Sequence, residues 1–170
     1  MPKVQRFWLM KSEPDAFSLD DLKAISPKSE LWDGVRNYQA RNFMRDEMSV
    51  GDGVLYYHSN CTPPGVVGLA YIASSEAEPD QTQFDKKSKY HDPKSKPEDP
   101  RWVAARVGYV AHFPQQIDLP RLKATESLSE MKVVQRGMRL SIQPVDKNHF
   151  LEVCKLGGIK TPLKLVKAAV

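Results

Sequence analysis

The segment WDGVRNYQARN, from Trp32 to Asn42, gathers the side chains best suited to specific chemistry in this chain. It holds one indole, two guanidinium groups and two asparagine amides around a glycine turn. Binding of a nucleobase requires an aromatic face for stacking, polar groups for the hydrogen-bonding edge and cations for phosphate. The segment therefore indicates a base-binding site, although Trp32 fits the hydrophobic core equally well and Asn37 fits a helix cap.

Lys11 and Glu13 form the one candidate pair for catalysis. They lie two residues apart at the end of a predicted strand, so they could face the same way as a general acid and base, or simply form a salt bridge. The four histidines lack metal-ligand spacing, and the sequence has no nucleophile elbow, P-loop or dinucleotide fingerprint. We therefore expect no metal and no cofactor, and we favour binding over turnover.

Charge is unevenly distributed along the chain. The net charge is +4, yet residues 1–85 hold 8 lysines and arginines against 13 acidic residues, and residues 86–170 hold 17 against 8. A basic half of this kind is a plausible footprint for a polyanion such as nucleic acid. A solvated, lysine-rich surface explains the same composition without any partner.

Length and composition favour a single soluble domain in the cytosol or nucleus, for which we predict a cytoplasmic location. A monomer is expected because the sequence has no obvious heptad or exposed apolar stripe. A chain of 170 residues has the usual size of one domain. No apolar run is long enough to cross a membrane, and the apolar stretch near the N-terminus is too short for a secretory signal. Cys61 and Cys154 are too few for a disulfide framework and form no CxxC pair, so we expect both to be reduced.

The elements that position these residues alternate without regular crossover helices. β-forming runs predict strands at 6–11, 54–59, 66–74, 101–113 and 138–145, and helical periodicity predicts helices at 18–26, 37–48, 119–124, 127–137 and 146–156. The strands at 54–59 and 66–74 read as a hairpin. This order predicts an α+β fold, with a small and mostly antiparallel barrel.

Local signals add detail to these elements. Ser18, Asn37 and Asp146 are expected helix caps, and Ser127 or Ser129 would cap the helix at 127–137. Gly68 inside a strand predicts a bulge or a close backbone approach. Residues 76–100 predict a long surface loop, which is often functional or mobile. In the strand at 138–145, Leu140 and Ile142 should face the core and Arg139, Ser141 and Gln143 the solvent.

Five segments in this order resemble the EVE domain family: WLMKSEP at 8–14, WDGVRNYQARN at 32–42, GDGVLYYHS at 51–59, GVVGLAYI at 65–72 and RLSIQPV at 139–145. The resemblance covers about 6–156, so we expect one domain over 1–170 with a C-terminal tail at 157–170. It implies a PUA-like fold, a small curved mostly antiparallel β-barrel with flanking helices, related to YTH and ASCH domains. It also implies a reader of a modified base in DNA or RNA, such as 5-methylcytosine or 5-hydroxymethylcytosine, without turnover or metal.

By motif, the resemblance implies a ligand pocket made of Trp8, Lys11, Ser12, Glu13, Trp32, Val35, Arg36, Asn37, Tyr57, His58, Ser59, Arg139 and Ser141. In this hypothesis Trp32 stacks on the base, and Asn37 or the backbone at Gly34 reads its edge. Phosphate contacts would come from Arg36, Arg41, Lys86, Lys87 and Lys89. Two alternatives stay open: an ASCH-like enzyme acting on a modified nucleoside through Lys11 and Glu13, and a module that binds an acidic protein.

Overall fold

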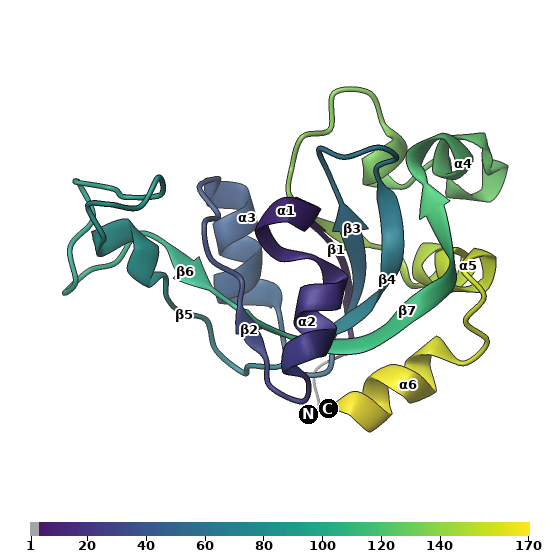
Figure 1. Cartoon of the computed structure of the whole chain (residues 1–170), viewed down its shortest axis with the longest axis horizontal. Coiled ribbons are helices and arrows are strands. Elements are labelled where there is room, and N and C mark those ends of the chain that lie inside the picture. The colour runs from purple at the N-terminus through teal and green to yellow at the C-terminus, as the bar shows by residue number, and fades with distance from the viewer. Residues whose placement is uncertain (1–3) are drawn as a thin grey trace.

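The computed structural model describes residues 4–170 and builds them around one curled six-stranded sheet flanked by helices (Figure 1). The strand order is β2-β7-β4-β3-β1-β8, and β5 and β6 form a separate ribbon. The strands are β1 Phe7–Ser12, β2 Glu30–Leu31, β3 Gly53–His58, β4 Gly65–Ile72, β5 Glu78–Pro79, β6 Val103–Ala104, β7 Arg106–Asp118 and β8 Ile142–Val145. The expected α+β fold with a barrel-like sheet is confirmed.

The helices lie around this sheet and none is long and apolar enough to span a membrane within residues 4–170. They are α1 Pro14–Phe17, α2 Leu19–Ile25, α3 Tyr38–Asn42, α4 Leu119–Ala124, α5 Lys147–Leu156 and α6 Pro162–Ala169. A π-helical turn spans Phe43–Glu47, and 3₁₀ turns span Gln81–Phe84, Glu126–Leu128 and Lys132–Val134.

Strand β1 explains why its sequence is continuously apolar. It pairs in parallel with β3 and antiparallel with β8, so it has neighbours on both sides. Its side chains alternate between two cores, one on each face of the sheet: Trp8 and Met10 join the first, and Phe7 and Leu9 the second. A strand that is buried on both faces has no polar face to show, as the sequence predicted.

Gly68 lies where β4 passes closest to β7. A Cβ built on it would lie 2.3 Å from the carbonyl oxygen of Ala111, and the register of β4 against β7 shifts between Val66 and Gly68. The expected bulge with a close backbone approach is therefore confirmed. The hairpin of β3 and β4 is confirmed as well, with its own register shift between Tyr56 and Tyr57. Such shifts increase local twist and curl the sheet.

Three of the expected helix caps are present: Ser18, Asn37 and Asp146. Ser18 and Asp21 form a reciprocal capping box at α2, and Asp146 caps α5. The Asn37 side chain accepts a hydrogen bond from the Ala40 amide at 3.0 Å and begins α3. The single helix expected at 37–48 is wrong in form, because α3 ends at Asn42 and a wider π turn follows.

Three other expectations need correction. The helix expected at 127–137 is replaced by the two 3₁₀ turns, which begin after Thr125 and Met131, so neither Ser127 nor Ser129 caps a helix. The strand expected at 138–145 starts only at Ile142. Gln143, expected to face the solvent, is buried, and its amide donates a hydrogen bond to the Leu140 carbonyl at 2.8 Å. The strand expected at 101–113 is broken after Val103–Ala104 and then continues to Asp118.

The two ends of the described chain meet on one side of the sheet. The tail after residue 157 contains α6, which packs on β4 and β7 and buries Val166. At the other end, the Gln5 side chain donates to the Gly51 carbonyl at 2.9 Å, and the Val170 side chain lies beside the same glycine. Gly51 therefore marks a common anchoring point.

We expect Gly68→Ala to lower the free energy of unfolding by about 2 kcal/mol or more, since the methyl must displace β7 backbone. Gly137→Ala is the control: its methyl would meet no atom within 4 Å, and only its φ of +79° opposes the change. That control should cost about 1 kcal/mol. Urea denaturation measures both, and a Gly68→Ala protein as stable as the control would contradict the close approach.

Candidate functional site

A cavity of about 740 Å³, here called the base cavity, opens between the end of β1, the turn after β2 and the loop before β8. This volume suits one small planar ligand. Nine of the residues expected in the ligand pocket line it: Lys11, Ser12, Glu13, Trp32, Val35, Arg36, Ser59, Arg139 and Ser141. Segments far apart in the sequence therefore meet as the family resemblance implied.

Trp32 borders the base cavity and also belongs to the core. Only 8% of its surface is exposed, and its ring packs edge-to-face on Tyr56 with centroids 5.4 Å apart. Its amide donates to the Ala105 carbonyl at 2.8 Å, which fixes the backbone of the turn. Most of the indole surface is thus packed in the core, and only the small exposed part could contact a ligand in the cavity.

A buried carboxylate, Asp80, holds the other wall of the cavity in place. Its side chain is fully buried and accepts hydrogen bonds from the Gly34 amide at 2.8 Å, from Arg36 Nη1 at 3.0 Å and from both the amide and the hydroxyl of Thr82. Burial alone would raise the pKa of this carboxyl, but the bonds from Thr82, Gly34 and Arg36 outweigh it and hold the pKa below its ordinary value. Asp80 is therefore ionised and ties the long loop to the WDGVRN turn.

The guanidinium of Arg36 is fully hydrogen-bonded within the same network. Besides Asp80, its guanidinium donates to the carbonyls of Val35 and Tyr90 and to the Thr82 hydroxyl, so each of its nitrogens already has a partner. It also lies 5.3 Å from the Trp102 ring and 5.5 Å from the Tyr90 ring. The structure places Arg36 as an anchor of the loop and offers no free guanidinium for the expected phosphate contact. The Gly34 amide is likewise unavailable to read a base edge.

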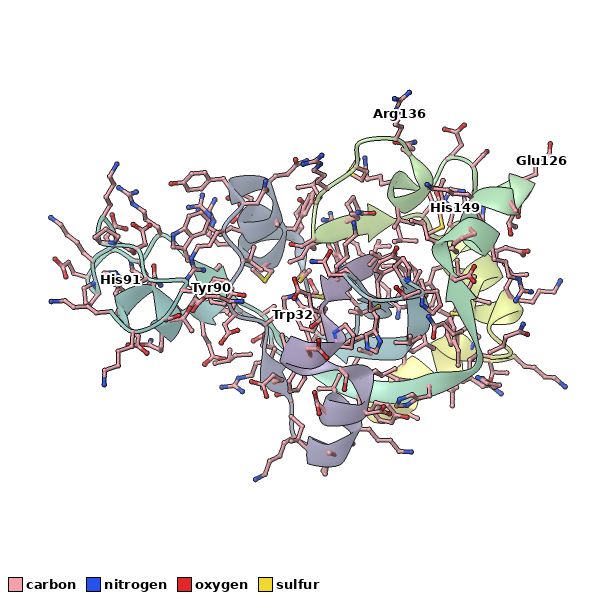
Figure 2. All side chains as sticks on the ribbon, turned by 45° about the horizontal axis from the view of Figure 1, so that its top comes forward. Trp32, Tyr90, His91, Glu126, Arg136 and His149 are labelled. Atoms are coloured by element: carbon pink, nitrogen blue, oxygen red, sulfur yellow. The ribbon has the colours of Figure 1, made fainter. Side chains whose placement is uncertain are left out.

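The loop expected at 76–100 is ordered by its own contacts. Gln83 is buried, its amide donating to the Trp102 carbonyl at 2.8 Å and its carbonyl accepting from the Trp102 amide at 3.1 Å. Tyr90 then packs on Gly34, where a Cβ would lie 2.7 Å from the ring. Tyr90 and Lys89 thus form a wall of the base cavity that faces the turn. Figure 2 shows Tyr90 on the side of the molecule where this loop extends.

Four of the expected pocket residues do not line the base cavity. Trp8 is 1% exposed and donates from Nε1 to Asp52 at 3.0 Å, so it is a core residue. His58 accepts a hydrogen bond from the Leu19 amide at 3.2 Å, and burial lowers its pKa. The Asn37 side chain caps helix α3. Tyr57 lines a neighbouring groove, where Lys11 Nζ lies 5.6 Å from its ring.

The expected phosphate contacts are also scattered. Arg41 donates to the Arg101 carbonyl at 2.9 Å and to Asn42, and it stacks 4.7 Å from the Tyr38 ring. Lys86 and Lys87 are exposed on the long loop and line neither the base cavity nor the neighbouring groove beside Tyr57. Of the five, only Arg36 and Lys89 reach the base cavity.

Two carboxylates that the sequence did not single out provide hydrogen-bond acceptors in the cavity. Glu30 and Asp33 line it, and neither forms an ion pair within residues 4–170. Burial and the nearby charge of Asp80 raise the pKa of Asp33. A single sequence could not identify them, because acidic residues beside a turn usually lie in solvent.

Lys11 and Glu13 both line the cavity but do not form a couple. Glu13 accepts a hydrogen bond from the Asn60 amide at 2.7 Å, and no ion pair joins Glu13 to Lys11 in the described part of the chain. Burial lowers the pKa of Lys11. Nowhere in residues 4–170 do three potential metal ligands gather. The arrangement therefore supports hydrogen bonding and stacking more directly than proton transfer.

We expect Asp80→Asn to lower the free energy of unfolding by about 3 kcal/mol, because Arg36 loses the partner of a buried pair. Hydrogen exchange should show faster exchange at the Gly34 and Thr82 amides. Asp46→Asn, which removes a fully exposed partner of Arg45, is the matched control and should leave the melting temperature unchanged. Equal effects of the two substitutions would show that Asp80 does not tie the loop to the turn.

The same carboxylate predicts a pH dependence. Because its pKa is lowered in the folded state, its stabilising effect is complete above the ordinary pKa of an unfolded aspartate and is lost as the pH falls through the lowered value. The wild-type protein should therefore lose stability across that acidic range, and Asp80→Asn should show a flatter profile there. Thermal melts from neutral pH to strong acid provide the comparison.

Comparisons with known proteins identify the family of the chain. A family model described as the EVE domain matches residues 6–156. Human thymocyte nuclear protein 1 is 43% identical over 166 residues, which cover 88% of this chain and 73% of that protein. The crystal structure of human THYN1 protein in complex with 5-methylcytosine containing DNA has a TM-score of 0.84 and 40% identity, and covers 92% of this chain and 99% of that one. A ZmASCH protein from Zymomonas mobilis, at TM-score 0.53 and 11% identity, shows a shared fold alone.

Proposed function

The chain belongs to the EVE domain family, and on this basis we propose that it is a non-catalytic reader of modified cytosine in nucleic acid. The observation that carries the proposal is the base cavity, where Trp32 and Tyr90 supply aromatic surface and Asp33, Glu30 and Ser141 supply polar groups. The complex of the human relative with 5-methylcytosine DNA supports the same ligand class. DNA is the form we favour for this reason.

Reading a base in this cavity requires the base to leave its stack. Cavities that take a single base accept it flipped out or from a single strand, at a cost of a few kcal/mol. Inside, a carboxylate is the natural acceptor for the exocyclic N4 amino group of cytosine. Asp33 and Glu30 supply this acceptor, and the apolar side chains of Val35, Leu31 and Phe17 supply surface for a 5-methyl group.

A binding titration tests the proposal. Single- and double-stranded DNA and RNA would carry cytosine, 5-methylcytosine or 5-hydroxymethylcytosine at one position, at two salt concentrations. We expect tighter binding to one modified base and, for Trp32→Ala, roughly ten-fold or greater weakening from lost stacking. Because Trp32 also packs in the core, Trp32→Phe and a thermal melt separate loss of folding from loss of contact. Equal, salt-sensitive binding to all strands would overturn the proposal.

Asp33 provides a second prediction. Asp33→Ala should reduce the preference for cytosine over thymine at the read position by about ten-fold, since one good base contact contributes about 1–3 kcal/mol of discrimination. Asp99→Ala makes the same change of charge at an exposed position outside the cavity and should leave the preference intact.

The preference should also weaken as the pH falls through the raised pKa of Asp33, because protonation removes the negative charge that strengthens the hydrogen bond and turns one carboxyl oxygen into a donor. A preference for cytosine that is unchanged both by Asp33→Ala and by acid would assign base reading to other groups.

An enzyme on the same cavity is the alternative. The observation in its favour is the half-buried Lys11, whose pKa is lowered by burial, so that more of its amine is neutral and able to accept a proton near neutral pH. Mass spectrometry of the oligonucleotides recovered from the titration distinguishes the two, because a reader returns them unaltered. Monomeric state and cytoplasmic location stay predictions, and the human relative is a nuclear protein by its name.

A further inference from the structure

A second hollow of about 770 Å³, here called the basic groove, adjoins the base cavity. We propose that the basic groove binds the sugar-phosphate backbone of the strand whose base enters the base cavity. Its cations are Lys11, Lys123, Arg136 and Arg139. This inference rests on the proposed function and adds to it the path of the strand.

The charge of the basic groove is unbalanced. Its lining contains four cationic side chains and no aspartate or glutamate. None of these four cations forms an ion pair or donates a side-chain hydrogen bond within residues 4–170, in contrast to Arg36 and Arg41. Lys123, Arg136 and Arg139 are exposed, and Figure 2 shows Arg136 pointing away from the body of the protein. Free cations of this kind are available to a polyanion.

The basic groove and the base cavity are adjacent. Lys11, Met138 and Arg139 line both hollows, so these residues form the ridge between them. A nucleotide with its base in one hollow therefore has its sugar and phosphates at the ridge. From there a strand can continue along Arg136 and Lys123 without crossing an acidic residue of the groove lining.

The floor of the basic groove suits a nucleic acid strand. The rest of its lining is largely apolar and offers a surface against which sugar rings can pack: Tyr57, Leu119, Val133 and Val134. Lys11 lies at the junction, half-buried and 5.6 Å above the Tyr57 ring, so a phosphate there would supply the counter-charge that the protein does not. An acidic peptide would find the same cations but would have no group for the adjoining base cavity. The position of the groove beside that cavity therefore favours nucleic acid.

The first test removes two groove cations that lie outside the base cavity. Lys123→Gln with Arg136→Gln should weaken binding to modified and unmodified strands alike, and the slope of log affinity against log salt should fall by about one per cation removed. The preference for the modified base should be retained. Lys160→Gln with Lys164→Gln removes the same charge from exposed positions outside both hollows and should leave the slope unchanged.

The second test neutralises the partner instead of the protein. Oligonucleotides would carry a methylphosphonate linkage on either side of the modified base. We expect a neutral linkage on one side to weaken binding to the wild-type protein and to have no further effect on the Lys123→Gln, Arg136→Gln protein. Such non-additivity is the signature of a direct contact.

The outcomes separate this inference from the function on which it rests. If the wild-type protein prefers a modified base while the groove variant keeps the wild-type salt slope, the strand path is wrong and the reader function stands. If no modified base is preferred, the reader function fails. Binding of an acidic polypeptide that depends on Lys123 and Arg136, with no effect of neutral linkages, would overturn the strand path in favour of a protein partner.

Discussion

The buried carboxylate of Asp80 is the interaction on which the site depends. An unpaired carboxylate away from water costs several kcal/mol, so its donors must all be in place when the loop folds. Those donors come from Thr82 beside it and from Gly34 and Arg36, more than forty positions earlier in the chain. Once they meet, Tyr90 is pressed against Gly34 and the base cavity has its second wall. The cavity is thus a consequence of satisfying one charge.

The arginines divide into those that hold the fold and those that are free. Arg36 and Arg41 present planar guanidinium groups to carbonyls and aromatic rings, a use for which arginine is better suited than lysine. Arg136 and Arg139 follow a 3₁₀ turn on an exposed segment and have no such partners among residues 4–170. The two bound arginines lie in the acidic half, residues 1–85, and the two free ones in the basic half, residues 86–170, so the charge available to a partner is even more one-sided than the sequence count suggests.

Local features were predictable from the sequence, and long-range ones were not. The caps at Ser18 and Asp146 depend on neighbours within a few residues. The apolar run of β1 and the glycine inside β4 make long-range contacts, but their residue types alone indicate burial and a close backbone approach. The roles of Arg36 and Gly34 depend on Asp80, which no local pattern links to them. The helix expected at 127–137 had suitable periodicity, but the chain turns there in two short 3₁₀ segments. The family resemblance named nine residues that line the base cavity, whereas Glu30, Asp33 and Tyr90 could be identified as lining residues only from the folded structure.

The anchoring of both chain ends at Gly51 has a further consequence. Gln5 and Val170 lie against the same turn, and Gly51 lines neither the base cavity nor the basic groove. A domain whose entry and exit points coincide can be inserted into a loop of another protein without stretching either fold. The same closure permits circular permutation through a short linker, with new termini opened elsewhere. A protein joined at these ends would therefore attach at a turn that lines neither the base cavity nor the basic groove.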